Sequence, residues 1–227
     1  MKAVALVAQK GGAGKTTIAT ELAVAAVRAG YRTAVFDLDP QASAGVWGDD
    51  RGGEPPQVLG VQAPRLGTFL DSARAQGAEL VFLDTAPHAD SIAVAAARAA
   101  DLVLIPCKPS PRDAKAIRAS LAAVSGLAGK PCWVVLNEAR PGTAMVRLTA
   151  RALEEAGVAV CPYRLGARVA FVHALTEGRA ASEWEPEGAA AAEVLALWRW
   201  LCRRLGMPSK APAAAAGGRR AGAAGDT

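Results

Sequence analysis

The chain has 227 residues, of which 52% are hydrophobic, and a formal net charge of +5. This length suffices for one α/β domain with a large buried core. Every run of eighteen residues contains charge, which excludes a membrane-spanning helix. The N-terminus enters an apolar run directly, without the basic, apolar and small-residue progression of a secretory signal, so we expect a cytoplasmic protein.

The first predicted elements are a buried strand over residues 2–8 and a helix over residues 18–28, joined by a glycine-rich loop. The loop ends in Gly14-Lys15-Thr16, the chemically active part of the phosphate-binding pattern G-x-x-x-x-G-K-[ST]. Gln9 stands where that pattern has its first glycine, so the match is imperfect. Free amide groups at a helix N-terminus favour a polyphosphate, which predicts a nucleotide site at this loop.

A second lysine precedes the glycines, and the loop reads Lys10-Gly11-Gly12-Ala13-Gly14-Lys15-Thr16-Thr17. This pattern resembles the deviant Walker A loop of the ParA/MinD ATPases. The resemblance implies a P-loop NTPase that uses ATP and Mg²⁺ and contacts the nucleotide with all of these residues. It also implies that Lys15 neutralises charge on the β- and γ-phosphates, while Lys10 reaches across a nucleotide-bound dimer. A glycine-rich turn with a solvated lysine is the competing interpretation.

Two acidic motifs follow apolar runs that read as strands, with Asp37 and Asp39 after the second strand and Asp84 after the third. Since parallel strands share one carboxyl edge, we expect these carboxylates to converge on the phosphate loop. Mg²⁺ would take the Thr16 hydroxyl as a ligand, with Asp37 and Asp84 holding its waters. By resemblance, Asp39 positions the attacking water. The alternative makes all three carboxylates simple turn residues.

Strands and helices then alternate, which predicts a single α/β domain with a mostly parallel, twisted sheet flanked by helices on both faces. The expected elements are strands at 101–106, 133–137 and 158–162, and helices at 111–127, 144–155 and about 190–205. The ATPase domain is expected to span residues 1–207. Residues 208–227 are rich in Ala, Gly and Arg without periodicity, and we predict a disordered tail there.

Further parts of the chain resemble the family's base-binding region. By that resemblance Asn137 contacts the adenine, and Pro162 and Arg164 lie where the chain closes over the base. Asn137 has a structural alternative as a turn residue that ends a strand. We interpret His88 and His173 as non-catalytic, although His88 could belong to a switch loop. The four cysteines lack metal-site spacing and read as reduced core thiols, which disfavours the iron–sulfur branch of the superfamily.

Arginines supply the candidate nucleic-acid surface. Arg147 and Arg151 are four residues apart on one predicted helix, and Arg168 begins a segment that resembles the family's R-x-A-[FY]-x-x-A signature. Nonspecific DNA binding rests on such contacts to phosphates, although a solvated surface is the ordinary alternative. The last predicted helix combines an apolar stripe with arginines, as an interfacial membrane helix does, but a helix that packs on a sheet needs the same stripe.

We therefore expect a small ParA-type partition ATPase that hydrolyses ATP slowly until a partner stimulates it. The resemblance implies a homodimer in the ATP state, nonspecific DNA binding at the nucleoid, and a small ParB-like centromere-binding partner. The alternative is a MinD-like or cargo-positioning ATPase that acts on a membrane surface or a protein cluster. A metabolic P-loop enzyme of the dethiobiotin or cobyrinate type is disfavoured because those enzymes lack the lysine found at position 10.

Overall fold

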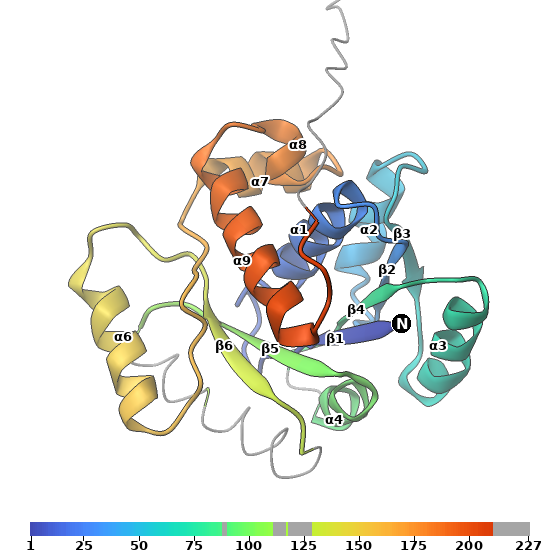
Figure 1. Ribbon diagram of the computed structural model, residues 1–227, viewed down its shortest axis with the longest axis horizontal. Helices are drawn as coiled ribbons and strands as arrows, with labels where there is room; N and C mark the ends of the chain where they lie inside the picture. The colour runs from blue at the N-terminus through green and yellow to red at the C-terminus, as the bar shows by residue number, and fades with distance from the viewer. Residues whose placement is uncertain (88–89, 111–116, 118–128, 211–227) are drawn as a thin grey trace, which may run out of the picture.

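The computed structural model describes residues 1–87, 90–110, 117 and 129–210, and centres on a parallel β-sheet (Figure 1). Six strands in the order β3-β2-β4-β1-β5-β6 form the described sheet. Their bounds are Lys2–Leu6 for β1, Thr33–Asp37 for β2, Gln57–Gly60 for β3, Leu80–Asp84 for β4, Leu102–Cys107 for β5 and Cys132–Leu136 for β6. Because all the strands are parallel, their carboxyl ends form one edge.

Helices cover both faces of the sheet, as the sequence predicts (Figure 1). One face carries α1 (Lys15–Arg28), α2 (Ser43–Asp50), α7 (Val169–Thr176), α8 (Ala181–Trp184) and α9 (Ala189–Leu205), which share one hydrophobic cluster. The other carries α3 (Leu66–Ala75), α4 (Asp90–Ala99) and α6 (Ala144–Glu155), which share a second cluster. The continuous apolar runs of β4 and β5 follow from this arrangement, since both of their faces are buried.

Most predicted elements are present with small shifts at their ends. Helix α6 has the predicted bounds, and α1 begins at Lys15, three residues before the predicted start. The strand expected at 158–162 is wrong, because this segment forms only an isolated bridge between Val134 and Val160. The helix predicted over 111–127 falls, apart from the buried Ile117, outside the described residues, and His88 lies outside them too.

Helix α9 packs its apolar stripe into the core beside α1. Val194, Leu197, Trp198 and Leu201 on this stripe are all buried. The stripe is therefore not available to lie in a lipid interface, which removes the observation that favoured a membrane helix here. In the part of the chain that the structure describes, no helix is both long and apolar enough to span a bilayer.

The described chain ends against the opposite edge of the sheet from the phosphate loop. Tyr31, two residues before β2, donates from its hydroxyl to the carbonyl of Pro208 at 2.6 Å. The ammonium of Lys210 lies 4.8 Å from the centre of the Tyr31 ring. The predicted tail thus begins with residues that contact the domain, and the remainder of that prediction, 211–227, lies outside the described residues.

Candidate nucleotide site

The loop between β1 and α1 has the backbone shape of a phosphate cradle. Gly12 and Gly14 adopt left-handed backbone conformations, with φ of 68° and 96°, which residues other than glycine rarely adopt. Gly14 is the N-cap of α1, and its carbonyl accepts the first helical hydrogen bond, from the Ile18 amide at 3.0 Å. The first amides of α1 therefore have no partner within the helix, and together with the helix dipole they favour an anion.

The two lysines of the loop differ in their environment. Lys15, the first residue of α1, is buried, whereas Lys10 is exposed beside a cavity of about 100 Å³ that the loop shares with the end of β5. Burial lowers the pKa of Lys15, and the charges of Asp84 and Asp39 oppose that effect. An ammonium held in this way gains most from an added anion, since a phosphate would offset the cost of its burial.

Thr16 and Asp84 meet directly beside the loop. The Thr16 hydroxyl donates to Asp84 Oδ2 at 2.6 Å, while the buried Asp84 Oδ1 has no hydrogen-bond partner within the described residues. Burial raises the pKa of Asp84 to about 7; the Thr16 hydrogen bond lowers it and the charge of Asp37 raises it further. A cation that neutralised this carboxylate and took the Thr16 hydroxyl as a ligand would satisfy both groups, which fits Mg²⁺.

A cluster of three or more His, Cys, Asp or Glu side chains able to hold a metal is absent from the described ranges. A nucleotide-linked Mg²⁺ does not need one, because phosphate oxygens and water supply most of its ligands.

Asp37 and Asp39 shape the loop that follows β2. Asp37 lies next to Asp84 in the register of the sheet, as predicted for carboxylates at one strand edge. Its two oxygens accept from the backbone amides of Asp39 and Gly45, each at 2.9 Å. Asp39 is half-buried and accepts from the Gln41 amide at 2.9 Å, at the wall of an open cleft of about 770 Å³. The structure thus brings the three carboxylates to one edge beside Lys15.

A third cavity, of about 380 Å³, adjoins the loop beside α7. Asn137 lines it, but the side-chain amide of Asn137 donates to the Ala13 carbonyl of the phosphate loop at 2.9 Å. Pro162 and Arg164 are exposed and do not line this cavity. The other residues that line this cavity are Thr17, Glu138, Gly166, Ala167, Arg168, Val169, Phe171, Val172, Leu175 and Thr176, of which only Thr17 was predicted as a nucleotide contact. The signature segment from Arg168 onward was the available sequence signal.

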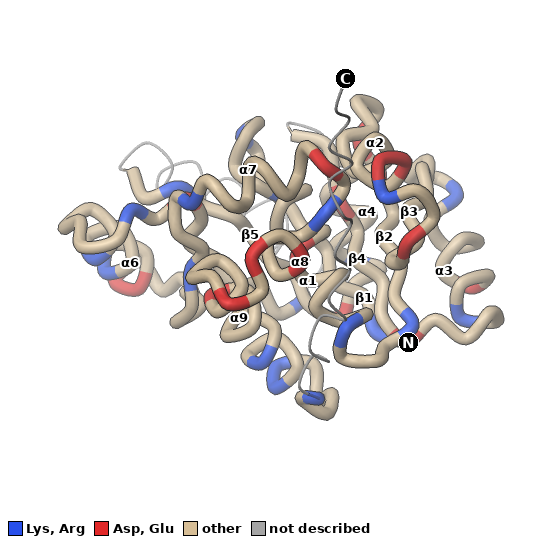
Figure 2. Tube along the Cα trace, turned by 90° about the horizontal axis from the view of Figure 1, so that it is seen from above, with Lys and Arg blue, Asp and Glu red and all other residues tan. Residues whose placement is uncertain are grey.

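The predicted DNA arginines fall into two different environments. Arg147 and Arg151 are exposed on α6, where Arg151 pairs with Glu155 at 2.7 Å. Figure 2 shows basic residues gathered along α6 and at the end of α9. Arg168 is separate from them, since its guanidinium pairs with Glu193 of α9 at 2.7 Å. Its role as a DNA contact stays a prediction.

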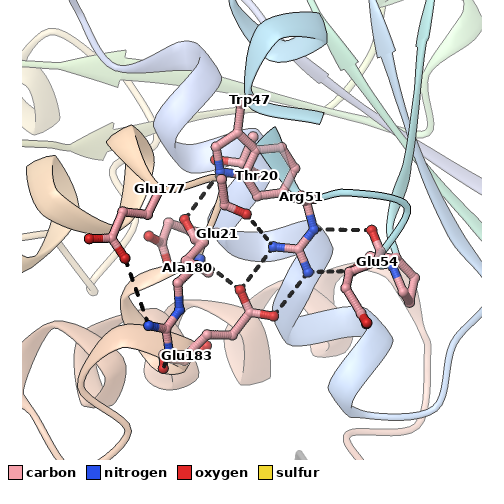
Figure 3. A network of polar contacts seen from close by, with 12 residues as sticks. Thr20, Glu21, Trp47, Arg51, Glu54, Glu177, Ala180 and Glu183 are labelled. Carbon is pink, nitrogen blue, oxygen red and sulfur yellow. Dashed lines mark hydrogen bonds and ion pairs between the residues drawn. The ribbon is translucent and has the colours of Figure 1, made fainter. Parts of the chain in front are cut away.

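A further polar cluster joins α1, α2 and α8, and sequence reasoning did not find it (Figure 3). Arg51 follows α2, has a side chain only 4% exposed, and binds both carboxylate oxygens of Glu183, each at 2.9 Å. The Arg51 guanidinium also lies 4.7 Å from the centre of the Trp47 ring. Glu21, on α1, accepts from the Ala181 amide at 2.8 Å. These contacts fix the helices that surround the site, as opposed to the site itself.

Comparison with known sequences agrees with this geometry. The profile of the CobQ/CobB/MinD/ParA nucleotide-binding domain, CbiA, matches residues 4–180. The chain is 34% identical over 200 residues to the Maintenance of carboxysome distribution protein A of Gloeobacter kilaueensis, covering 85% of this chain and 89% of that protein. It is 31% identical over 172 residues to the Chromosome-partitioning ATPase Soj of Thermus thermophilus, covering 63% and 64% of the two chains.

Solved structures share the fold. Apo McdA of Cyanothece matches with a TM-score of 0.71 at 16% identity, covering 90% of this chain and 99% of that chain. MinD of Pyrococcus horikoshii, solved with Mg-ADP, matches with a TM-score of 0.70 at 17% identity, covering 90% and 97%. The predicted resemblance is thereby confirmed: the chain belongs to the CobQ/CobB/MinD/ParA family of nucleotide-binding domains and is a ParA/MinD-type ATPase.

Proposed function

We propose that this ATPase is a nucleotide-driven dimer switch that distributes a large cargo over nonspecifically bound DNA. The observation that carries the proposal is the contrast between the two lysines of one loop, with Lys15 buried and Lys10 exposed. Lys15 would contact the phosphates bound by its own subunit. Lys10 lies at the surface, where it could contact the phosphates bound by a second copy. The resemblance of this loop to the deviant Walker A loop supports the same assignment, since in that family the second lysine reaches across the dimer.

The residues around the loop have separate tasks in this proposal. The loop amides and Lys15 hold the β- and γ-phosphates, and the Thr16 hydroxyl with Asp84 and Asp37 forms the Mg²⁺ site. When bound, Mg²⁺ would neutralise phosphate charge and orient the phosphate oxygens. Asp39, at the wall of the open cleft of about 770 Å³, orients the attacking water. Phosphoryl transfer depends mainly on such positioning and on electrostatics, so these groups suffice for slow hydrolysis that a partner accelerates.

The cargo is proposed from the relatives. Two proteins named for carboxysome distribution match 85% and 81% of this chain, and the partitioning ATPase Soj matches 63%. The longer matches favour a protein assembly as cargo over our first expectation, DNA partition. Partition with a small ParB-like partner remains the second candidate, favoured by the match to Soj. In cells that lack the gene, clustering of a protein assembly would support the first, and loss of a plasmid or chromosome region the second.

DNA is the proposed surface along which the cargo is distributed. Arg147 and Arg151 on α6 are the proposed contacts, together with Arg168 if its pair with Glu193 opens. A nucleotide-dependent dimer doubles whatever basic surface one copy presents, so ATP would strengthen DNA binding and place the protein at the nucleoid. A membrane surface has less support, because the apolar stripe of α9 is buried.

The test compares Lys15→Ala and Lys10→Ala with the wild type, each with ATP, with ADP and without nucleotide. We expect Lys15→Ala to abolish nucleotide binding, since the phosphates lose their buried cation. Lys10→Ala should bind ATP as a monomer and fail to dimerise, as measured by light scattering. Normal turnover in Lys15→Ala would refute the site, and an intact ATP-dependent dimer in Lys10→Ala would refute the exchange between subunits.

A further inference from the structure

The side chain of Asn137 lies beneath the phosphate loop. Asn137 directly follows β6, and its backbone amide donates to the carbonyl of Cys107 at the end of β5, at 2.8 Å. The position of its backbone is therefore set by the sheet and not by the loop. Its side chain is buried, with 4% of the residue exposed, and its Nδ2 donates to the Ala13 carbonyl at 2.9 Å. A carbonyl can only accept, so the group that faces it must be the amide N–H of Asn137.

The contact between this amide and the loop is close. A Cβ atom built on Gly14 would lie 1.9 Å from Asn137 Nδ2 and 3.0 Å from Asn137 Cγ. These distances leave no room for a side chain at position 14, independently of the left-handed backbone found there. The Asn137 amide is thus seated directly against the loop backbone, between the sheet and the point where α1 begins.

The hydrogen bond controls more than the carbonyl that accepts it. In a planar trans peptide the C=O and the following N–H point in opposite directions. Fixing the Ala13 carbonyl toward Asn137 therefore turns the Gly14 N–H toward the other side of the peptide, away from Asn137. In a phosphate-binding loop the backbone N–H groups are the groups that cradle the phosphates. One buried side chain thereby sets the direction of one of these donors.

We propose that Asn137 is a positioning residue for the phosphate loop, acting on the polyphosphate through the Ala13–Gly14 peptide and not by selecting the base. This inference rests on the proposed ATP site. It differs from the expectation that Asn137 contacts adenine, because the two roles make different demands on the ligand. A loop-positioning residue matters for any polyphosphate, whereas a base contact matters only for a ligand that carries the base.

Inorganic tripolyphosphate separates the two roles, since it has the phosphates of ATP and no base. Asn137→Leu keeps the approximate shape of the side chain and removes its N–H donors without adding charge, and Asn137→Ala removes the side chain beyond Cβ. We expect each substitution to lower the affinity for ATP, ADP and tripolyphosphate by a similar factor, roughly tenfold for one lost buried hydrogen bond. The ratio of ATP to GTP affinity should stay at the wild-type value. Dissociation constants come from titration calorimetry on the full chain, with Mg²⁺ held constant.

The remaining outcomes are decisive as well. One contrary outcome is that the variants bind tripolyphosphate as the wild type does but bind ATP more weakly. Another is that their preference for ATP over GTP falls. Either would show that Asn137 contacts the base and would overturn the proposal. Unchanged affinity for all ligands overturns it too. Melting temperatures without ligand identify folded variants, and loss of the fold in both would assign Asn137 to the whole domain and overturn the proposal. A wild type that binds neither ATP nor tripolyphosphate would instead defeat the proposed ATP site.

Discussion

Glu21 and Glu183 belong to the polar cluster drawn in Figure 3, and their pKa values are shifted in opposite directions. Burial raises the pKa of Glu21 to about 8, although its hydrogen bond from the Ala181 amide opposes that rise. Burial acts in the same direction on Glu183, but the hydrogen bonds from Arg51 and the Ala180 amide outweigh it and leave the pKa of Glu183 lowered. The arginine is thus committed to Glu183, and Glu21 keeps its proton across neutral pH.

This difference predicts a pH dependence of stability that Glu21→Gln should reduce. Glu21 holds its proton in the folded state up to about pH 8, while in the unfolded chain it loses the proton near its ordinary value of 4.5. The folded state therefore binds more protons between these values, so the free energy of unfolding falls as pH rises through that window. Glutamine stays neutral and keeps an acceptor for the Ala181 amide, so the variant should lose less stability than the wild type as the pH rises.

Urea unfolding at pH 5 and at pH 8 measures the effect. Asp84 also has a raised pKa, so the wild type and the variant must be compared with each other and not with a flat line. We expect the two proteins to be similar at pH 5 and the Gln variant to be more stable by a few kcal/mol at pH 8. Parallel profiles would show that Glu21 does not hold its proton.

At the scale of one element, α2 connects the loop after β2 with the region around α8. Its first turn is held by Asp37, which accepts from the Gly45 amide at 2.9 Å. Arg51, directly after its last turn, binds Glu183 and also donates to the Gly178 carbonyl at 2.8 Å. One short helix is therefore attached at its beginning to Asp37 and at its end to the segment between α7 and α8.

Arg51→Met tests this attachment. Methionine keeps much of the apolar volume beside Trp47 but leaves Glu183 without its cation, and losing one partner of a buried ion pair is strongly destabilising. Since the Glu183 side chain is 27% exposed, water partly compensates for the lost cation, and we expect the free energy of unfolding to fall by about 2 kcal/mol. Arg74→Met, at an exposed ion pair with Asp71, is the matched control and should cost less than about 1 kcal/mol. Equal losses in both variants would contradict the buried attachment.

Elements of this fold differ in how much local signal they carry. The strands β4 and β5 could be predicted because burial on both faces makes them continuous apolar runs. The edge strand β3 could not, since three of its four residues are exposed and none is fully buried. The four residues of α8 are too few to show a helical period.

The site shows the same division between local and distant information. The phosphate loop and its carboxylates could be predicted because each lies within a short motif and parallel strands bring those motifs to one edge. The contact between Asn137 and Ala13 joins residues 124 apart, and that between Ala181 and Glu21 joins residues 160 apart. Each depends on how helices and loops pack after the sheet has formed, which no local pattern records.

At the scale of the whole molecule, the proposed DNA surface can be tested against a matched basic surface elsewhere. Arg147 and Arg151 on α6 are exposed and four residues apart, as are Arg199 and Arg203 on α9. Reversing either pair to glutamate changes the net charge equally. We expect Arg147→Glu/Arg151→Glu to weaken ATP-dependent DNA binding and to reduce its salt dependence by about one unit of slope per lost phosphate contact.

Gel retardation at increasing salt, with ATP, with ADP and without nucleotide, measures this effect. The α9 pair, Arg199→Glu/Arg203→Glu, should bind DNA nearly as the wild type does. An equal loss in both variants would mean that only total charge matters, and a loss confined to the α9 pair would move the DNA surface to the other face of the sheet.

The contact of Tyr31 with Pro208 has a practical consequence for watching this protein at work. It holds the end of the described chain at the amino edge of the strands, while the nucleotide loop occupies the carboxyl edge. A fluorophore introduced at position 210 would therefore sit across the width of the domain from the face where two copies would meet. Such a reporter could follow the position of the protein without interfering with contact between the two copies.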